Sequence, residues 1–371
     1  MTVSKKALLI ASLLWLGGFP ATTPPVSAQI IQAQVAQTTP SDSQDEDDRL
    51  RDLLRQGREL VDAGDLSAAI AIYQQAAVLE PDNARIFSAI GFLEARQNNF
   101  QAAVDAYEQA LVLESDNADF YYALGFSRAN LGDNAGAADA YQRATQLSRD
   151  HVEAHIGLGI VLARQGDYEG AIEAYQQVLM QRPNDAEIYE FIGAAYIQQQ
   201  KYQEALAALQ RAAELDPRRG SIQLNLGVAL LNLGDTVAGM DALKRAAELE
   251  PRNGLIFLQI GDLYRAQGNL NDALTQYQRA VSVQPSLKEA HMALGELLLE
   301  REDYLRAIVT YRELVELDPE NPDAHYNLGV ALQGRDRTEE AAIVFQQALT
   351  LYQQQNNLEG VEKVEATLDD L

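Results

Sequence analysis

The chain has 371 residues, no cysteine, and 54 acidic against 29 basic side chains, which gives a formal charge of −25. The lack of cysteine excludes disulfides, thiolate zinc sites, iron–sulfur clusters and cysteine nucleophiles. A charge this negative argues against binding nucleic acid through its phosphates. A hydrophobic content of 47% is sufficient for a folded core.

Residues 1–28 have the three parts of a secretory signal peptide. Lys5 and Lys6 precede a 13-residue apolar run, residues 7–19, and a polar stretch with small residues ends at Ala28. We predict cleavage after Ala28, which leaves an exported chain of charge −27 without an integral membrane segment. The periplasm is the expected location, with the thylakoid lumen or the extracellular space as alternatives. A retained anchor is the other reading, although 13 apolar residues span only about 20 Å of a bilayer core of about 30 Å.

Residues 29–48 are rich in Gln, Thr, Ser and Asp and show no hydrophobic period. Such a composition buries too little apolar surface to offset the entropy of folding. We therefore predict a disordered leader over these residues.

A period of 34 residues fills the rest of the chain. Glycine recurs at Gly57, Gly91, Gly125, Gly159, Gly193, Gly227, Gly261, Gly295 and Gly329. Twelve residues after each glycine comes Ala or Gly, and four residues further comes Tyr, Leu or Phe. The spacing predicts two amphipathic helices per unit, with the glycine allowing a close approach of the two helices. The large residue should fill the space between neighbouring pairs, and a proline ends six of the units.

These phased positions resemble the tetratricopeptide repeat family. The resemblance implies an all-α fold, an α–α superhelix of nine helix-turn-helix repeats of 34 residues within residues 50–355. The repeats should start near residues 50, 84, 118, 152, 186, 220, 254, 288 and 322. Residues 356–371 read as a C-terminal capping helix, since polar caps protect the ends of repeat arrays. Ser115 and Arg149 stand where proline closes other repeats, so those two junctions are less clearly marked.

No catalytic residue is predicted. The period has no inserted loop of the kind on which helical scaffolds place catalytic groups. The sequence also lacks a nucleophile elbow, a phosphate-binding loop, a zinc-protease motif and a dinucleotide turn. We accordingly expect a non-enzymatic protein without a cofactor.

The histidines have a structural and a metal-binding interpretation. His155, His291 and His325 lie four residues before a phased glycine, where other repeats have Phe or Tyr. This position indicates packing in place of an aromatic ring. His151 and His155 are four residues apart beside acidic residues, so a weak divalent metal site is the alternative.

In tetratricopeptide repeat proteins the first helix of each repeat lines a concave groove with its second, fifth, ninth, twelfth and thirteenth residues. By this resemblance the partner-binding groove comprises Arg51, Arg58, Arg85, Phe92, Arg96, Tyr122, Phe126, Ile156, Ile160, Arg164, Ile197, Leu224, Val228, Leu231, Leu258, Glu289, Glu296 and Glu300. The arginines lie in the first four repeats. The last three repeats contribute acidic residues, including Asp262 and Asp323, with Arg265 as the exception. The alternative is that the apolar residues pack between neighbouring first helices and the arginines pair with nearby carboxylates.

The sequence therefore predicts an exported, non-enzymatic interaction scaffold. It would bind a protein or peptide, or a partner helix, in its concave groove and support assembly or maturation of an envelope or membrane complex. The alternative is a manganese-handling assembly factor for a photosynthetic membrane complex, by weak resemblance to the cyanobacterial periplasmic repeat proteins that help to assemble photosystem II. The acidic end of the groove and the pair His151 and His155 would then hold the ion.

Overall fold

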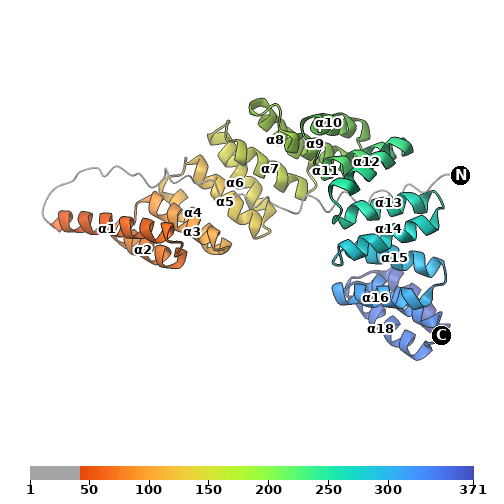
Figure 1. Ribbon diagram of the computed structural model, residues 1–371. Coiled ribbons are helices and arrows are strands. Elements are labelled where there is room, and N and C mark those ends of the chain that lie inside the picture. Colours follow the sequence, from red (N-terminus) through yellow and green to blue (C-terminus); the bar gives the residue numbers. More distant parts are fainter. Residues whose placement is uncertain (1–41) are drawn as a thin grey trace. The chain divides into compact units, whose positions relative to one another are not determined.

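The computed structural model describes residues 42–371, and these residues form nineteen α-helices and no strands (Figure 1). The predicted signal peptide lies outside the described residues. The predicted leader is wrong at its end, because residues 42–48 belong to α1 (Asp42–Asp62). Acidic side chains are favourable in the first turns of a helix, and Asp48 forms an ion pair of 3.1 Å with Arg51 one turn later.

The chain divides into two compact units, with the boundary between Lys201 and Tyr202. The described part of the N-terminal unit, residues 42–201, contains α1, α2 (Leu66–Leu79), α3 (Ala84–Arg96), α4 (Phe100–Leu113), α5 (Ala118–Asn130), α6 (Asn134–Leu147), α7 (Val152–Arg164), α8 (Tyr168–Gln181) and α9 (Ala186–Gln198). The C-terminal unit, residues 202–371, contains α10 (Tyr202–Leu215), α11 (Gly220–Asn232), α12 (Thr236–Leu249), α13 (Gly254–Ala266), α14 (Leu270–Val283), α15 (Lys288–Glu300), α16 (Tyr304–Leu317), α17 (Pro322–Gln333), α18 (Thr338–Gln354) and α19 (Leu358–Asp369). In each unit, helices that follow one another in the chain pack together.

One turn geometry recurs between the two helices of every repeat. A residue with φ between 56° and 88° occurs at intervals of 34, at Gly64, Asn98, Gly132, Gly166, Gln200, Gly234, Gly268, Glu302 and Asp336. Wherever the next residue is aspartate, its side chain accepts a hydrogen bond from the backbone N–H three residues later and caps the second helix. The turn is therefore set by local backbone geometry, whether or not glycine occupies it.

The phased glycines lie directly beneath the large residue of the second helix. A Cβ atom on Gly159 would be 2.4 Å from Cε1 of Tyr175, and a Cβ on Gly329 would be 2.5 Å from Cε1 of Phe345. The predicted close approach of the two helices is thus confirmed. These large residues pack on the glycine of their own repeat. Tyr141 packs on Gly125 of its own repeat and also on Gly157 of the next repeat.

The second helix of a repeat ends at the same repeat position whether or not proline follows it. The helices α4 and α6 end at Leu113 and Leu147, although Ser115 and Arg149 follow in place of proline. The next helix starts at a strong cap here, because the Asn117 side chain accepts hydrogen bonds from the backbone N–H groups of residues 119 and 120. Proline is consequently not required to mark these junctions.

The C-terminal end of the array has a final helix, α19, inside the segment expected to cap it. Val364 of this helix is fully buried, whereas Leu358 is 75% exposed. The ammonium of Lys363 lies 3.8 Å from the ring centroid of Tyr326 in α17, and Thr367 hydrogen-bonds the Tyr326 hydroxyl.

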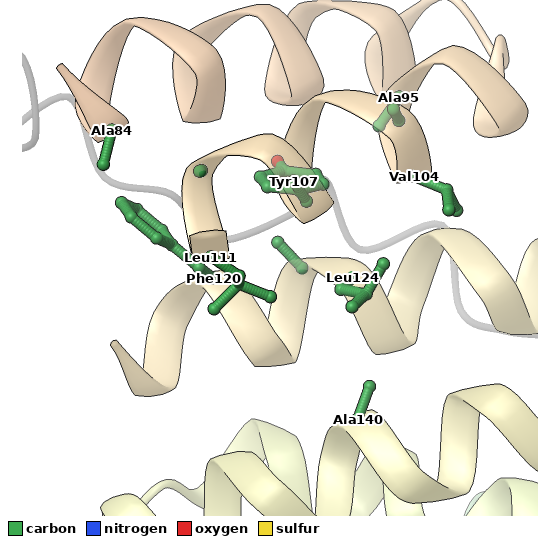
Figure 2. Packing of buried hydrophobic residues seen from close by; sticks show 11 residues of the cluster. Ala84, Ala95, Val104, Tyr107, Leu111, Phe120, Leu124 and Ala140 are labelled. Carbon is green, nitrogen blue, oxygen red and sulfur yellow. The ribbon is translucent and has the colours of Figure 1, made fainter. Parts of the chain in front are cut away.

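The core of each unit consists of small residues facing large ones. Figure 2 shows one such cluster in the N-terminal unit, in which Tyr107 and Leu111 of α4 pack with Phe120 and Leu124 of α5. The large tyrosines bury their hydroxyl groups as well as their rings. The hydroxyls of Tyr73, Tyr107, Tyr175 and Tyr311 have no hydrogen-bond partner among the described residues. The all-α repeat fold predicted from the sequence is confirmed.

Candidate partner-binding surface

We call the second, fifth, ninth, twelfth and thirteenth residues of the repeats the first-helix face. Spacings of three, four and seven residues place these side chains on one side of each first helix. In the N-terminal unit the predicted arginines Arg51, Arg58, Arg85 and Arg96 are exposed, and Phe92, Ile156 and Arg164 are half buried. The remaining predicted residues of this unit, Tyr122, Phe126, Ile160 and Ile197, are only 4–9% exposed.

The buried aromatic residues correct one part of the sequence-based prediction. The ring of Tyr122 lies 5.8 Å from that of Tyr141 and 5.0 Å from that of His151, and the ring of Phe126 lies 6.3 Å from that of Phe100. These rings fill the space between neighbouring helices and offer a partner little surface. Tyr122 and Phe126 therefore fit the alternative interpretation, in which the apolar residues pack between helices, rather than the interpretation in which they are exposed anchors for a partner.

Phe92 differs from the other aromatic residues of this face. Its side chain is partly exposed at the edge of the cluster formed by α1, α2 and α3. The guanidinium of Arg96, four residues later, lies 5.7 Å from the centroid of the Phe92 ring. An arginine close to an aromatic face is a cation–π arrangement, and it leaves the guanidinium N–H groups available to a third group.

Two acidic groups on the same face of the N-terminal unit, Asp119 and Glu153, are already paired. Asp119 lies 3.3 Å from Nε2 of His151, and Glu153 accepts a hydrogen bond of 2.8 Å from Arg182. His151 is therefore a partner of Asp119, and its hydrogen bond lowers the pKa of the Asp119 carboxyl. By contrast, Arg58, Arg85 and Arg96 form no ion pair with any described residue.

The two neighbouring histidines do not form the metal pair considered as an alternative. His151 caps α7, because its Nδ1 accepts a hydrogen bond of 3.2 Å from the backbone N–H of Ala154. His155 instead places Nε2 3.1 Å from the carbonyl oxygen of Arg149. Of the two remaining ring nitrogens, Nε2 of His151 lies 3.3 Å from Asp119, and Nδ1 of His155 is buried without a hydrogen-bond partner among the described residues. Within residues 42–371, no group of three or more His, Cys, Asp and Glu residues is arranged to hold a metal ion.

A hydrogen bond across the inter-repeat turn explains the phase of the other histidines. His155, His291 and His325 each place Nε2 2.9–3.1 Å from the carbonyl oxygen six residues earlier, and the Tyr189 hydroxyl donates a bond of 3.4 Å to the equivalent carbonyl. The prediction of packing in place of an aromatic ring was incomplete, because the ring also satisfies a turn carbonyl. The sequence shows that the three histidines occupy the same repeat position. It does not show that the turn brings the carbonyl oxygen six residues earlier within hydrogen-bond distance of the ring.

In the C-terminal unit the apolar residues that the sequence predicted for the groove are buried. Leu224, Val228, Leu231 and Leu258 are 3–8% exposed and belong to the packing between helices. These side chains, like Tyr122 and Phe126, are therefore structural.

The acidic members of the face in the C-terminal unit surround one arginine. Arg265 of α13 donates hydrogen bonds of 3.0 Å to Glu296 and 3.2 Å to Glu300, both on α15. Glu289 is half buried near the start of α15. The sequence-based prediction of an acidic groove end is thus corrected in part, because Arg265 neutralises some of that charge.

Asp262 lies beside this network and is unusual among the carboxylates. The Tyr277 hydroxyl donates a hydrogen bond of 2.7 Å to Asp262. Burial raises the pKa of Asp262 to about 6, and neither this hydrogen bond nor the nearby Arg265 offsets the effect fully. The sequence places Asp262 on this face but could not predict its raised pKa, because the groups around it come from three different helices.

Residues 42–371 include no helix that is both long enough and apolar enough to cross a bilayer.

The fold and this surface define a class, the helical-repeat proteins built from stacked helix pairs. Tetratricopeptide repeat models match residues 57–97, 93–132, 295–334 and 324–359, and a model of the C-terminal domain of cilia and flagella-associated protein 70 matches residues 115–304. The chain belongs to the tetratricopeptide repeat family. A comparison with curated proteins finds no significant match.

Two solved structures with TM-scores above 0.5 support the same fold. A tetratricopeptide repeat protein from Parabacteroides merdae is 18% identical, with a TM-score of 0.54 over 68% of this chain and 99% of that chain. The Cut9–Hcn1 assembly of the APC/C is 18% identical, with a TM-score of 0.52 over 76% of this chain and 55% of the other. MamA from Desulfovibrio magneticus is 24% identical, with a TM-score of 0.44 over 45% and 95%.

Proposed function

We propose that this protein is a non-enzymatic scaffold that works outside the cytoplasm. It binds a protein or peptide partner on its first-helix face and thereby supports assembly or maturation of an envelope or membrane complex. Membership of the tetratricopeptide repeat family supports partner binding as its mode of action. Residues 1–28 of the sequence support export.

The observation that supports this function most directly is the surface of α1 and α3. Phe92 is the half-exposed aromatic residue there, and Arg58, Arg85 and Arg96 make no ion pair within the described residues. An exposed aromatic residue with adjacent arginines is the residue combination found at the centres of protein interfaces. Tyr122 and Phe126 are used by the core. Tyr326, the other partly exposed aromatic residue of the face, already contacts Lys363 and Thr367 of α19.

The test is capture of partners from the envelope fraction with residues 29–371, beside the Phe92→Ala variant. A triple variant that also replaced Tyr122 and Phe126 would remove buried rings and damage the fold, at a cost of about 3–5 kcal/mol for each. Phe92→Ala should keep the helical circular dichroism spectrum and lose the partner. Identical captures by the two proteins would refute the proposed surface.

Export has its own test. Expression of the full chain should yield an envelope or secreted product whose N-terminus is Gln29. A product that keeps residues 1–28 and sediments with membranes would show instead that the segment is retained as an anchor.

A further inference from the structure

Arginine predominates at the first-helix-face positions of α1 and α3, although α1 as a whole carries more acidic than basic side chains. At the five positions of the first-helix face, α1 and α3 together have the basic residues Arg51, Arg58, Arg85 and Arg96 and the single acidic residue Asp62. Arg51 is paired with Asp48 at 3.1 Å, whereas the other three arginines form no ion pair with a described residue. This local excess of positive charge occurs in a chain whose formal charge is −25.

The arginines are arranged around one apolar side chain. Arg85, Phe92 and Arg96 lie at intervals of seven and four residues, which places them along one side of α3. Arg58 occupies in α1 the position that Phe92 occupies in α3, and Leu54 of α1 packs in the same cluster as Phe92. A ligand that covers Phe92 would therefore meet guanidinium groups along the same helix and on the neighbouring helix.

Building on the proposed function, we infer that the N-terminal unit selects an acidic segment, in which carboxylates flank an aromatic or aliphatic side chain. The apolar side chain covers Phe92, and the carboxylates accept forked hydrogen bonds from Arg85 and Arg96, with Arg58 as a further donor. A basic segment would bring like charges together at this surface. Charge complementarity thus identifies the chemistry of the partner.

The acidic charge of the whole chain opposes this partner only at long range. Exposed charges more than about 8 Å apart are largely screened at physiological ionic strength, whereas a guanidinium–carboxylate contact is direct. Asp62, one turn after Arg58 in α1, has no ion pair among the described residues, whereas Asp119 and Glu153 on later first helices are held by His151 and Arg182. Asp119 and Glu153 therefore do not compete for Arg85 and Arg96.

The experiment is selection from a random dodecapeptide display library on immobilised residues 29–371, at 0.15 M salt. Enriched peptides are then synthesised, together with analogues in which each Asp or Glu becomes Asn or Gln. Their affinities are measured by fluorescence anisotropy for the unaltered protein, for Arg85→Gln/Arg96→Gln and for Arg143→Gln/Arg149→Gln. The last protein is the matched control, because Arg143 and Arg149 are exposed cations of the same unit outside the first-helix face.

We expect enriched peptides with a net negative charge and an apolar centre. Arg85→Gln/Arg96→Gln should weaken their binding about tenfold or more, and the amide analogues should lose a similar factor. The control pair should change binding by less than about twofold, since exposed charges away from a contact contribute little. Circular dichroism should show unchanged helix content in both variants.

Enrichment of neutral or basic peptides would overturn the inference, as would equal losses in the two arginine variants. Phe92→Ala separates this failure from failure of the proposed function. Peptides that bind without regard to charge but depend on Phe92 would leave the proposed function standing and remove the charge selectivity. If neither Phe92→Ala nor Arg85→Gln/Arg96→Gln changed the affinity of the enriched peptides, both the proposed binding surface and its charge selectivity would be refuted. A selection that enriched no peptide would refute both as well.

Discussion

Replacing Asp262 by asparagine should stabilise the C-terminal unit at neutral pH. Asp262 is a partly buried carboxylate whose polar neighbours come from α13, α14 and α15, and burial raises its pKa to about 6 from the ordinary 3.8. Asparagine has nearly the same shape, and its Oδ1 can still accept the hydrogen bond that Tyr277 donates at 2.7 Å. The substitution therefore removes the cost of burying charge and keeps the hydrogen bond.

The magnitude follows from the two pKa values. A native pKa of about 6 against an unfolded value of 3.8 corresponds to a penalty of about 3 kcal/mol on the ionised form. The native state then holds a proton that the unfolded state has released between pH 4 and 6, so stability falls as pH rises through this window. Because part of the Asp262 side chain is exposed, and because asparagine loses the attraction of Arg265, we expect a gain of about 1–3 kcal/mol at pH 7.5. Near pH 4 the gain should disappear.

The assay is hydrogen exchange of α13 and α14, measured by mass spectrometry at pH 7.5 and pH 4.5. Exchange reports local opening free energies, which suits a repeat array whose parts need not unfold together. Asp241→Asn is the control, since Asp241 is an exposed carboxylate of the same unit, and it should change stability by less than about 0.5 kcal/mol at either pH. A loss of protection in Asp262→Asn at pH 7.5, or a gain independent of pH, would refute the reasoning.

Three further predictions concern stability. Gly159→Ala should destabilise the N-terminal unit by about 1–3 kcal/mol in urea unfolding, because the new Cβ would lie 2.4 Å from Cε1 of Tyr175; a neutral result would contradict this packing. Glu302→Gly should add up to about 1 kcal/mol by relieving a φ of 57°, and a lower urea midpoint would argue against it. Arg265→Gln should reduce protection of α15 at pH 7.5, since it leaves Glu296 without its hydrogen bond of 3.0 Å, and unchanged exchange would show that the ion pair contributes nothing.

The repeat fold was predictable because each structural requirement recurs every 34 residues. A single glycine sixteen residues before a tyrosine would not identify a helix pair. The same spacing at Gly91, Gly125 and Gly159 predicts that the two helices of each repeat pack closely at the glycine. The start of α1 was not predictable in the same way. Residues 42–48 have no apolar period, and their helix depends on continuity with the first repeat and on local charge placement.

The candidate surface was predictable in position but not in exposure. The spacing correctly places Phe92 and Tyr122 on first helices, yet only Phe92 remains half exposed. Tyr122 is covered by Tyr141 and His151, which come from later helices. Pairing of charges has the same limitation, because Arg265 and Glu296 are 31 residues apart and meet only once the helices pack.

The large residue that packs on the phased glycine has an additional role in the seventh repeat, where it is Tyr277. The glycine opposite lies against tyrosine in most repeats, against Leu243 in the sixth and against Phe345 in the last, so the packing does not need a hydroxyl group. The phenolic oxygen has no partner within the described residues at Tyr107 or Tyr175, but at Tyr277 it bonds to Asp262. Tyrosine and phenylalanine are therefore interchangeable along most of the array, while the seventh repeat depends on the oxygen itself. In an array of nearly equivalent repeats, the bond between Tyr277 and Asp262 thus couples this tyrosine position to a carboxyl group with a pKa of about 6.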